Sequence, residues 1–422
     1  NTMVGYNAGT SLPPCNSNTL VGYNAGANGA QLSDTVGIGY SALGGVCATL
    51  PHLGAVAIGS YALNAETTGL SNVAVGYKAL CAVTAGGCNV VVGYQAGDAV
   101  TTGAGNIGIG FNAVGAVTTG DYNIGIGIAA AGAITTGTDN VMIGLNSGGF
   151  TTGSFNTFIG SLAGCGVTSG SCNVAIGYDA MNSTLTGIQN IAIGRSAGTN
   201  LTTACCSTLI GHAAGQASTT GSNTAVGWCA LSSITTQSNN TAIGIGAGQI
   251  GTTPTSLTAI GHTAGQYSNA TGTTAIGRSA AQNSTSQAHT AVGYFALNSI
   301  IGGASSTAIG YQAGFSATGG CNTFIGHNSG CAVTTGACNT IVGPYVGTTT
   351  LTNNVVLADG SANIRFQANS SGAWSYNGVN FGNAGDTLQS GGAGAPPTWV
   401  TGASGTFTTA DSKTVTVTNG II

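Results

Sequence analysis

A short pattern of hydrophobic and polar positions recurs along most of the chain. In each copy an Ile or Val precedes an invariant Gly, as in NTFIGHNSG at Asn322–Gly330 and NTMVGYNAG at the start of the chain. Counting that glycine as an anchor gives 21 copies between Gly5 and Gly343, spaced 16 or 17 residues apart except for one step of 20 residues. Self-similarity at a fixed period predicts a repeat architecture in which each unit stacks on its neighbours.

Three further positions keep their character from copy to copy. The residue four before the anchor is usually Asn, the residue three after it is small, and a second apolar position follows about seven after it, as at Val83 and Val100. We expect the Ile or Val before the anchor to face the interior, and the Asn column to form an internal ladder of hydrogen bonds. The expected core column includes Val4, Ile109, Ile159, Ile176, Ile260 and Ile325.

Each unit contains two short β-prone runs, one close to T-A-I-G and the other close to A-V-T-T, with Gly, Asn and Ser at both ends. No periodicity of 3.6 residues survives, so helices are not expected. The fold class predicted is all-β, a parallel β-solenoid of about 21 coils of 16–17 residues. At about 4.8 Å per coil it would form a rod of about 100 Å. A three-sided hexapeptide-type helix should show three apolar columns; two are found, which favours a two-sided roll.

An aromatic residue often follows the anchor directly. A two-sided roll has a thin core, so these rings and the small-residue face need burial, and packing several copies around an axis would supply it. We therefore expect an oligomeric rod, preferably a homotrimer. The rival interpretation is an exposed aromatic ladder that binds a ligand. The tyrosines of this column are Tyr6, Tyr23, Tyr40, Tyr77, Tyr94, Tyr178, Tyr294 and Tyr311.

Composition and charge narrow the function. Charged residues make up 3% of the 422 residues and apolar residues 42%, so the chain is not a disordered polar segment. The formal net charge is −4 with five Lys and Arg in total, which argues against nucleic-acid binding. No run of about 18 apolar residues is present, so no membrane span is expected.

Three cysteine pairs share the pattern C-x-V-T-x-G-x-C around a Gly-containing turn. The six-residue gap is longer than zinc sites favour and suits local disulfides, which would place the chain in an oxidising, extracellular setting. The alternative is reduced cysteines that fill small apolar slots. Cys205 and Cys206 are vicinal, while Cys15, Cys47, Cys229 and Cys321 have no obvious local partner. The predicted disulfides are Cys81–Cys88, Cys165–Cys172 and Cys331–Cys338.

The sequence offers little for catalysis, and we expect neither an enzyme nor a cofactor. The nine acidic residues are isolated rather than paired. His212, His262 and His327 each follow an anchor several coils apart, so one chain could not bring them to a single metal. Each could form a ring of three in a trimer, but we favour the interpretation that His replaces Tyr in the aromatic column.

The motifs NTAVGW, NVAIGY, STAIGYQAG and NTFIGHNSG resemble the head repeats of trimeric autotransporter adhesins, and similar repeats occur in the fibres of phages and large viruses. The resemblance covers roughly residues 1–347 and implies a left-handed parallel β-roll within a homotrimer. The unit here is slightly longer than in adhesin heads, and the paired cysteines depart from that pattern.

Three regions are expected. Residues 1–347 form the β-roll repeat domain. Residues 348–385 form a short β-meander. Residues 386–422 contain a Gly/Pro-rich connector and a terminal strand. The last two regions resemble the ends of tail-fibre proteins, which favours a virion fibre over an adhesin head.

The function predicted is a structural and adhesive fibre, extracellular on a virion or cell, that projects a binding tip toward a glycan or protein receptor. One alternative is a cell-surface filament in which rods join end to end. Another is an ice-binding solenoid, built on the repeated Thr pairs. Adjacent Thr residues point to opposite faces, so only one of each pair would face outward, which disfavours this alternative.

Overall fold

The fold is described by a computed structural model. It covers residues 1–12, 17–28, 32–45, 52–251, 253–378, 380–382, 386–389, 397–401, 405–408 and 414–417. Within these residues all regular structure is β, with no helix. The chain divides into two compact units, Asn1–Asn240 and Thr241–Ile422. Cys15 and Cys47 lie outside the described residues.

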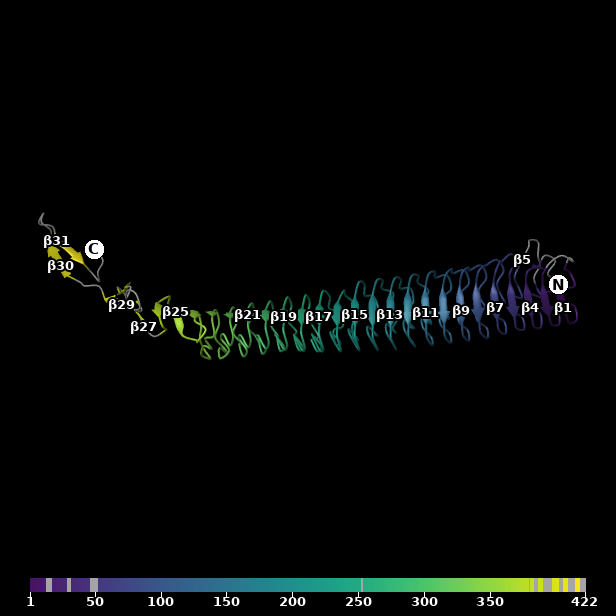
Figure 1. Ribbon diagram of the computed structural model, residues 1–422. Helices are drawn as coiled ribbons and strands as arrows, with labels where there is room; N and C mark the ends of the chain where they lie inside the picture. Colours follow the sequence, from purple (N-terminus) through teal and green to yellow (C-terminus); the bar gives the residue numbers. More distant parts are fainter. Residues whose placement is uncertain are drawn as a thin grey trace. The chain divides into compact units, whose positions relative to one another are not determined.

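The first unit is a parallel β-solenoid in which each turn contributes one three-residue strand, and successive strands follow chain order (Figure 1). A second parallel pair, β3 (Leu32–Ser33) with β5 (His52–Leu53), lies beside the first turns. The solenoid strands are β1 (Thr2–Val4), β2 (Thr19–Val21), β4 (Val36–Ile38), β6 (Val56–Ile58), β7 (Val73–Val75), β8 (Val90–Val92), β9 (Ile107–Ile109), β10 (Ile124–Ile126), β11 (Val141–Ile143), β12 (Thr157–Ile159), β13 (Val174–Ile176), β14 (Ile191–Ile193), β15 (Thr208–Ile210) and β16 (Thr224–Val226).

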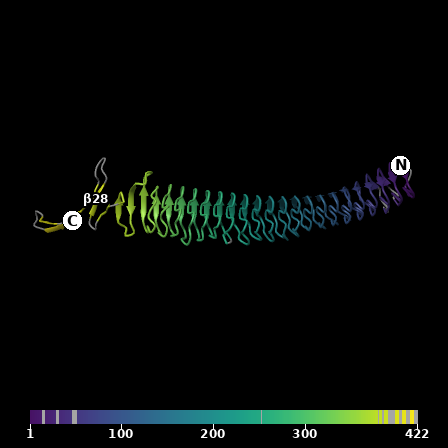
Figure 2. The same ribbon diagram turned by 90° about the horizontal axis from the view of Figure 1, so that it is seen from below.

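The second unit repeats this architecture and then changes it. Its strands β17 to β23 pair in parallel, in chain order and in register. Figure 2 shows the turns following one another in the order of the chain. With the first unit, the described residues contain about twenty solenoid turns. The strands are β17 (Thr241–Ile243), β18 (Thr258–Ile260), β19 (Thr274–Ile276), β20 (Thr290–Val292), β21 (Thr307–Ile309), β22 (Thr323–Ile325) and β23 (Thr340–Val342).

After the last turn the pairing becomes antiparallel. Strand β24 (Val355–Ala358) still pairs in parallel with β23, but it pairs antiparallel with β25 (Ile364–Ala368), which is followed by β26 (Trp374–Tyr376) and β27 (Asn380–Phe381). Two separate antiparallel pairs follow, β28 (Asp386–Gln389) with β29 (Thr398–Thr401) and β30 (Gly405–Thr408) with β31 (Thr414–Val417).

Each turn contains one strand where the sequence analysis expected two. The T-A-I-G run forms the strand, but the A-V-T-T run adopts bends without strand pairing. Its backbone is still satisfied between turns, because Thr101 N donates to Thr118 O at 3.0 Å. The apolar residue of this run is buried, as predicted: Val83, Val100, Val117, Ile134, Val167, Ile234 and Val333 are 0% exposed.

The predicted core column is wrong. The Ile or Val before each anchor faces outward in the single chain: Val4 is 57% exposed, Ile109 41% and Ile325 38%. Ile159, Ile176 and Ile260 are half-buried. The residue preceding each of these faces inward instead, as with Phe158, Ala175, Ala259 and Phe324 at 0%. Side chains alternate along a strand, so an inward Asn four before the anchor requires an outward residue one before it.

The predicted asparagine ladder is confirmed by the hydrogen bonds. Asn106 N and Nδ2 both donate to Asn89 Oδ1, at 2.8 and 3.1 Å, and Asn106 Nδ2 also donates to Gly120 O at 2.9 Å. The same three bonds recur at Asn123. Each buried amide therefore meets its neighbour in the preceding turn and a carbonyl in the following one, which removes the cost of burying it. The ladder residues are 0–7% exposed.

Candidate functional surface

The outer face of the parallel sheet is the most regular apolar surface of each unit. The first and third residues of every strand point outward, and in the first unit they are mainly Val, Ile and Thr. The third residue, the one before the anchor, is Ile or Val in every turn. In-register pairing aligns these side chains, for example Ile109 with Ile126 and Ile126 with Ile143. The result is a continuous column of branched apolar side chains along one face.

In the second unit the outward face becomes a two-column array. All seven strands read Thr, then a buried residue, then Ile or Val. The register keeps Thr on Thr and Ile or Val on Ile or Val from turn to turn. None of these strand residues is charged. The threonines are Thr241, Thr258, Thr274, Thr290, Thr307, Thr323 and Thr340, and they are half-buried.

The predicted aromatic column stacks along the surface of the first unit. Tyr6, Tyr23 and Tyr40 are stacked with centroids 5.3 Å apart. Tyr61 continues the row with edge contacts to its neighbours, and Tyr77, Tyr94 and Phe111 stack again. Tyr178 faces the Arg195 guanidinium at 6.0 Å. Tyr6 is 67% exposed and Tyr77 38%.

A shorter aromatic row follows the same position in the second unit. Tyr294 and Tyr311 stack at 5.4 Å, and Tyr311 stacks on His327 at 5.0 Å. Arg278 lies 5.5 Å from the Tyr294 ring. Where the rings are stacked, the faces that meet a neighbour are covered, and the ring edges are left to contact another surface. That arrangement suits packing against another surface better than stacking on a flat ligand.

The three anchor-following histidines belong to this aromatic column. His327 stacks on Tyr311, His212 stacks on Trp228 at 6.3 Å, and the Thr263 hydroxyl lies 3.4 Å from His262 Nδ1. Among the described residues, no group of three or more His, Cys, Asp or Glu could hold a metal. Also within that part of the chain, no helix is long and apolar enough to cross a membrane.

The three predicted local disulfides are absent: Cys81, Cys88, Cys165, Cys172, Cys331 and Cys338 are free thiols. The two members of a pair lie at different places on the turn and contact different neighbours. Cys81 lies in the hydrogen-bonded turn after β7, and its Sγ lies 3.7 Å from Asp98 O in the next turn of the solenoid. Cys88 precedes the asparagine ladder, with a left-handed φ of 59° and its N–H donating to Leu70 O in the preceding turn.

Burial raises the thiol pKa of three of these cysteines, Cys81, Cys165 and Cys331, each in the turn after a strand. A raised pKa lowers the fraction of reactive thiolate. The alternative of reduced cysteines in partly apolar slots fits these three half-buried thiols. Cys88, Cys172 and Cys338 are exposed.

In several of the repeated Thr pairs the first hydroxyl is held by the backbone. The first Thr of the pair donates its hydroxyl to the backbone of the next turn, as from Thr101 Oγ1 to Thr118 O at 3.0 Å and from Thr118 Oγ1 to Thr135 O at 3.0 Å. The same bond recurs in the second unit from Thr334 Oγ1 to Thr349 O at 3.1 Å. These hydroxyls therefore hold the turns together and are committed before any ligand arrives.

Two buried titratable groups escaped the sequence analysis. Glu66 occupies the apolar column where the next turn has Val83, and it is 0% exposed. Asn72 Nδ2 donates to Glu66 Oε1 at 2.6 Å. Asn72 has no ladder partner in the preceding turn, because that turn has Ala55 at the Asn position. Burial raises the Glu66 pKa to about 7, although the Asn72 bond opposes the shift. Its position in an otherwise apolar column of the repeat is the sequence feature that could have identified Glu66 as a buried acid.

His289 replaces Asn in the ladder of the second unit. Ser306 N donates to His289 Nδ1 at 3.3 Å, and Nε2 lies 2.9 Å from Ser286 Oγ. The Nδ1 acceptor thus performs the role of an Asn Oδ1, which assigns the ring proton to Nε2. Burial lowers the His289 pKa, so the neutral ring is favoured. Both residues are parts of the interior scaffold and not of an open site.

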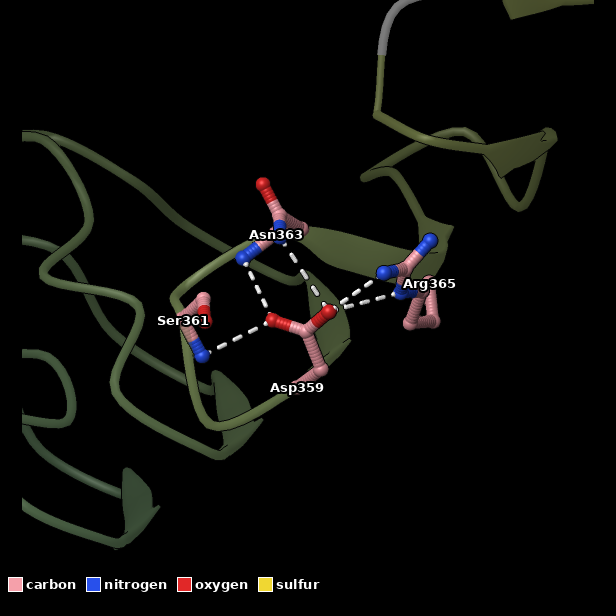
Figure 3. A network of polar contacts seen from close by, with 4 residues as sticks. All are labelled: Asp359, Ser361, Asn363 and Arg365. Carbon is pink, nitrogen blue, oxygen red and sulfur yellow. Dashed lines mark hydrogen bonds and ion pairs between the residues drawn. The ribbon is translucent and has the colours of Figure 1, made fainter.

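An ion pair joins Asp359, in the turn between β24 and β25, to Arg365 of β25 (Figure 3). Arg365 Nε donates to Asp359 Oδ2 at 2.9 Å, and Ser361 N and Asn363 N each donate to Asp359 Oδ1 at 3.0 Å. The Arg365 hydrogen bond, with help from Asn363, lowers the Asp359 pKa to about 2. The donors to the Asp359 carboxylate all come from residues 361–365 of the same hairpin, so the cluster stabilises that hairpin.

Surface hollows add no chemistry. One of about 510 Å³ runs along the turns of the first unit and is lined by polar and small residues, among them Asn7, Asn24, Tyr61 and Asn64. Another of about 300 Å³ is lined by Asn112, Asn146, Phe150 and Cys165. Neither lining contains a charged residue.

Comparison with models of protein families, with characterised proteins and with solved structures gives no match.

Proposed function

We propose that this chain is a structural fibre element that self-associates, as a homotrimer, through the outer face of its parallel sheet. The observation that carries the proposal is the column of outward Ile and Val along each unit, with Val4 57% exposed in the first and Ile325 38% exposed in the second. A protein that remained monomeric would leave this strip in water, and contiguous apolar patches of that length mark interaction surfaces.

The size of the strip is adequate for an interface. Each turn advances about 4.8 Å along the sheet, and two outward residues span about 10 Å across it, so a turn offers about 50 Å². Over the first unit alone, from β1 to β16, this gives about 700 Å² per chain. A standard interface buries about 800 Å² per partner. The aromatic rows directly after the anchors would extend the buried area.

The number of copies and the handedness come from the resemblance to adhesin-head repeats. In that architecture three left-handed rolls pack around an axis, and the thin core of a single roll is completed by its partners. Three chains of 40.6 kDa would give a particle of about 122 kDa. The fibre character is supported by the repeat itself, because adding turns lengthens a solenoid without changing its cross-section.

The location and the adhesive role rest on the resemblance alone. The three local disulfides from which an oxidising setting was expected are not formed in this structure. In the proposal the fibre lies outside the cell, on a virion or cell surface, and projects a tip toward a glycan or protein receptor. End-to-end joining of rods into a surface filament is the alternative assembly, and we propose no catalytic role.

Sedimentation of the purified protein tests self-association. Wild type should sediment as a species of about 122 kDa, and the triple variant Ile109→Lys, Ile126→Lys and Ile143→Lys should sediment as a monomer, because three charges would be buried unpaired at the interface. The matched control is Thr102→Lys, Thr119→Lys and Thr136→Lys, on exposed positions away from the sheet face. A monomeric wild type, or an outer-face variant that remains trimeric, overturns the proposal.

Ice binding is kept as a second candidate because of the array on β17 to β23. Its Thr hydroxyls and Ile or Val methyl groups repeat at about 4.8 Å along the sheet and about 7 Å across it. This Thr-x-Ile face, rather than the adjacent Thr pairs, would be the ice-facing surface. Thermal hysteresis in wild type that Thr290→Tyr abolishes and Thr119→Lys does not would favour this candidate; no hysteresis in wild type rejects it.

A further inference from the structure

Cys321 and Cys338 occupy the same position in consecutive turns. The register pairs Thr323 of β22 with Thr340 of β23, and each cysteine lies two residues before its threonine. The backbone between them is fixed by two bonds: Cys338 N donates to Gly320 O at 3.0 Å, and Asn339 N donates to Asn322 Oδ1 at 3.0 Å. These contacts hold the two turns in register at this point.

Both cysteines have the same backbone conformation, with φ of 58° and 60°, and both side chains are exposed. Identical residues in stacked turns are displaced by one inter-turn spacing, about 4.8 Å. That value lies within the range of about 4.4–6.8 Å between the α-carbons of disulfide-bonded cysteines. Bridging requires the β-carbons to approach by about 1 Å, in a turn that lies outside the strand.

No other described cysteines share this relationship. In the same column, Cys88 has Ser71 and Gly105 as neighbours, and Cys172 has Phe155 and Gln189. The Cys206 Sγ donates to Gln189 Oε1 at 3.6 Å. Cys331, which the sequence pattern pairs with Cys338, lies after β22 on another part of the turn and is half-buried, which raises its thiol pKa.

We propose that Cys321 and Cys338 are a reversible oxidation site that forms a disulfide between two turns of the solenoid. The oxidant class is a small-molecule disulfide. One cysteine thiolate attacks it and forms a mixed disulfide, which releases one small thiol. The second cysteine thiolate then displaces the other half. The two protein thiols lose two electrons and two protons, and the small disulfide is reduced to two thiols.

The disulfide would link the turns that contain β22 and β23, the last two turns before β24 and the antiparallel strands. A link between consecutive turns closes a loop of 17 residues, which restricts the unfolded chain and raises resistance of this end of the solenoid to unfolding. The site goes beyond the proposed fibre function and does not depend on self-association, because both residues belong to one chain.

Peptide mapping of the full-length protein tests the site. The chain is incubated with oxidised glutathione, free thiols are alkylated under denaturing conditions, and digestion with chymotrypsin and elastase is followed by mass spectrometry without reductant. We expect a cross-linked peptide that joins Cys321 to Cys338, with these two of the 12 cysteines protected from alkylation. Reduction before alkylation should restore both.

Two variants serve as matched controls. Cys338→Ser should abolish the cross-link and leave Cys321 alkylated or glutathionylated, whereas Cys331→Ser should retain it. If a variant does not fold, the peptide map of the oxidised wild-type protein still tests whether Cys321 and Cys338 are joined. A Cys331–Cys338 peptide, a cross-link between two chains on a non-reducing gel, or full alkylation of Cys321 and Cys338 after oxidation overturns the proposal.

Discussion

The anchor glycine is fixed by the approach of the next turn. Gly110 has φ +134°, a region that residues with a side chain rarely adopt, and a β-carbon there would lie 2.5 Å from Gly127 O. The same clash recurs at Gly293, where a β-carbon would lie 2.4 Å from Gly310 O. The invariance of this residue therefore reflects both its backbone conformation and the carbonyl of its neighbour.

Gly110→Ala should lower the free energy of unfolding by about 2 to 4 kcal/mol, because the backbone strain and the clash with Gly127 add together. Urea unfolding followed by circular dichroism measures the change. The control is Gly360→Ala, since nothing lies within 4 Å of a β-carbon there and its φ is not in the left-handed region. Equal stability of the two variants would contradict the role assigned to the anchor.

Glu66 should make stability depend on pH. Its pKa of about 7 in the folded state exceeds the value of 4.5 for a free carboxyl group. The folded state therefore binds the proton more tightly, so this contribution is fully present below pH 4.5 and is lost as pH rises through 7. The full difference amounts to about 3 kcal/mol.

Glu66→Gln removes this titration and keeps the shape and the acceptor oxygen for Asn72 Nδ2. The variant should gain stability over wild type by up to about 3 kcal/mol between pH 4.5 and pH 8. Denaturant unfolding of both proteins at the two pH values measures the difference. Asp139→Asn, at an exposed position, serves as control. A constant difference between Glu66→Gln and wild type at both pH values would refute the burial of a titrating carboxyl.

At the scale of the element, the three-residue strand divides its side chains between core and surface. Phe324 and Ile325 are adjacent in β22, yet Phe324 is 0% exposed and Ile325 is 38% exposed. The Phe324 ring packs over Gly314 and Gly330, whose lack of side chains provides the space. Alternation within a single strand thus decides which hydrophobic residue stabilises the turn and which one is available to a partner.

Phe324→Ala should cost about 3 to 5 kcal/mol of unfolding free energy, because it removes a fully buried ring and leaves a cavity. Ile325→Thr keeps the branched shape on the outer face and should cost under about 1 kcal/mol in the monomer. Chemical denaturation at low protein concentration compares the two. A larger loss of unfolding free energy for Ile325→Thr than for Phe324→Ala would show that the residue before the anchor is a core residue.

At the scale of the whole molecule, stability is transmitted between neighbouring turns. Each strand pairs only with the strands of the adjacent turns, and the ladder bonds follow the same path. Such chains approach a one-dimensional system in which interfaces between neighbours carry the cooperativity. The division into Asn1–Asn240 and Thr241–Ile422 adds two compact units with internal contacts of their own.

Thermal unfolding should therefore depart from a single two-state transition. Scanning calorimetry is expected to give a calorimetric enthalpy larger than the van't Hoff enthalpy, because the two units unfold at least partly separately. Measuring at several protein concentrations separates this effect from dissociation of an oligomer. Equal enthalpies at all concentrations would show that the chain unfolds as one cooperative body.

The sequence by itself determined the repeat, its all-β character, the parallel stacking of turns and the asparagine ladder. These follow from the period, from local propensity and from the need to pair buried amides, all of which are written in consecutive residues. Tertiary structure alone decided which face of the strand is buried, because a conserved apolar column looks the same inside or outside. The ladder hydrogen bonds place Asn inward, and alternation along the strand then places the Ile or Val before the anchor outward.

The cysteines show the same limit. Spacing along the chain suggested a partner seven residues away, whereas stacking brings together Cys321 and Cys338, residues 17 apart. In a solenoid the residues one period apart are the spatial neighbours, because each turn returns the chain to the same place one inter-strand spacing further on. Local sequence distance is therefore a poor guide to contact, and the register of the turns is the quantity that decides it.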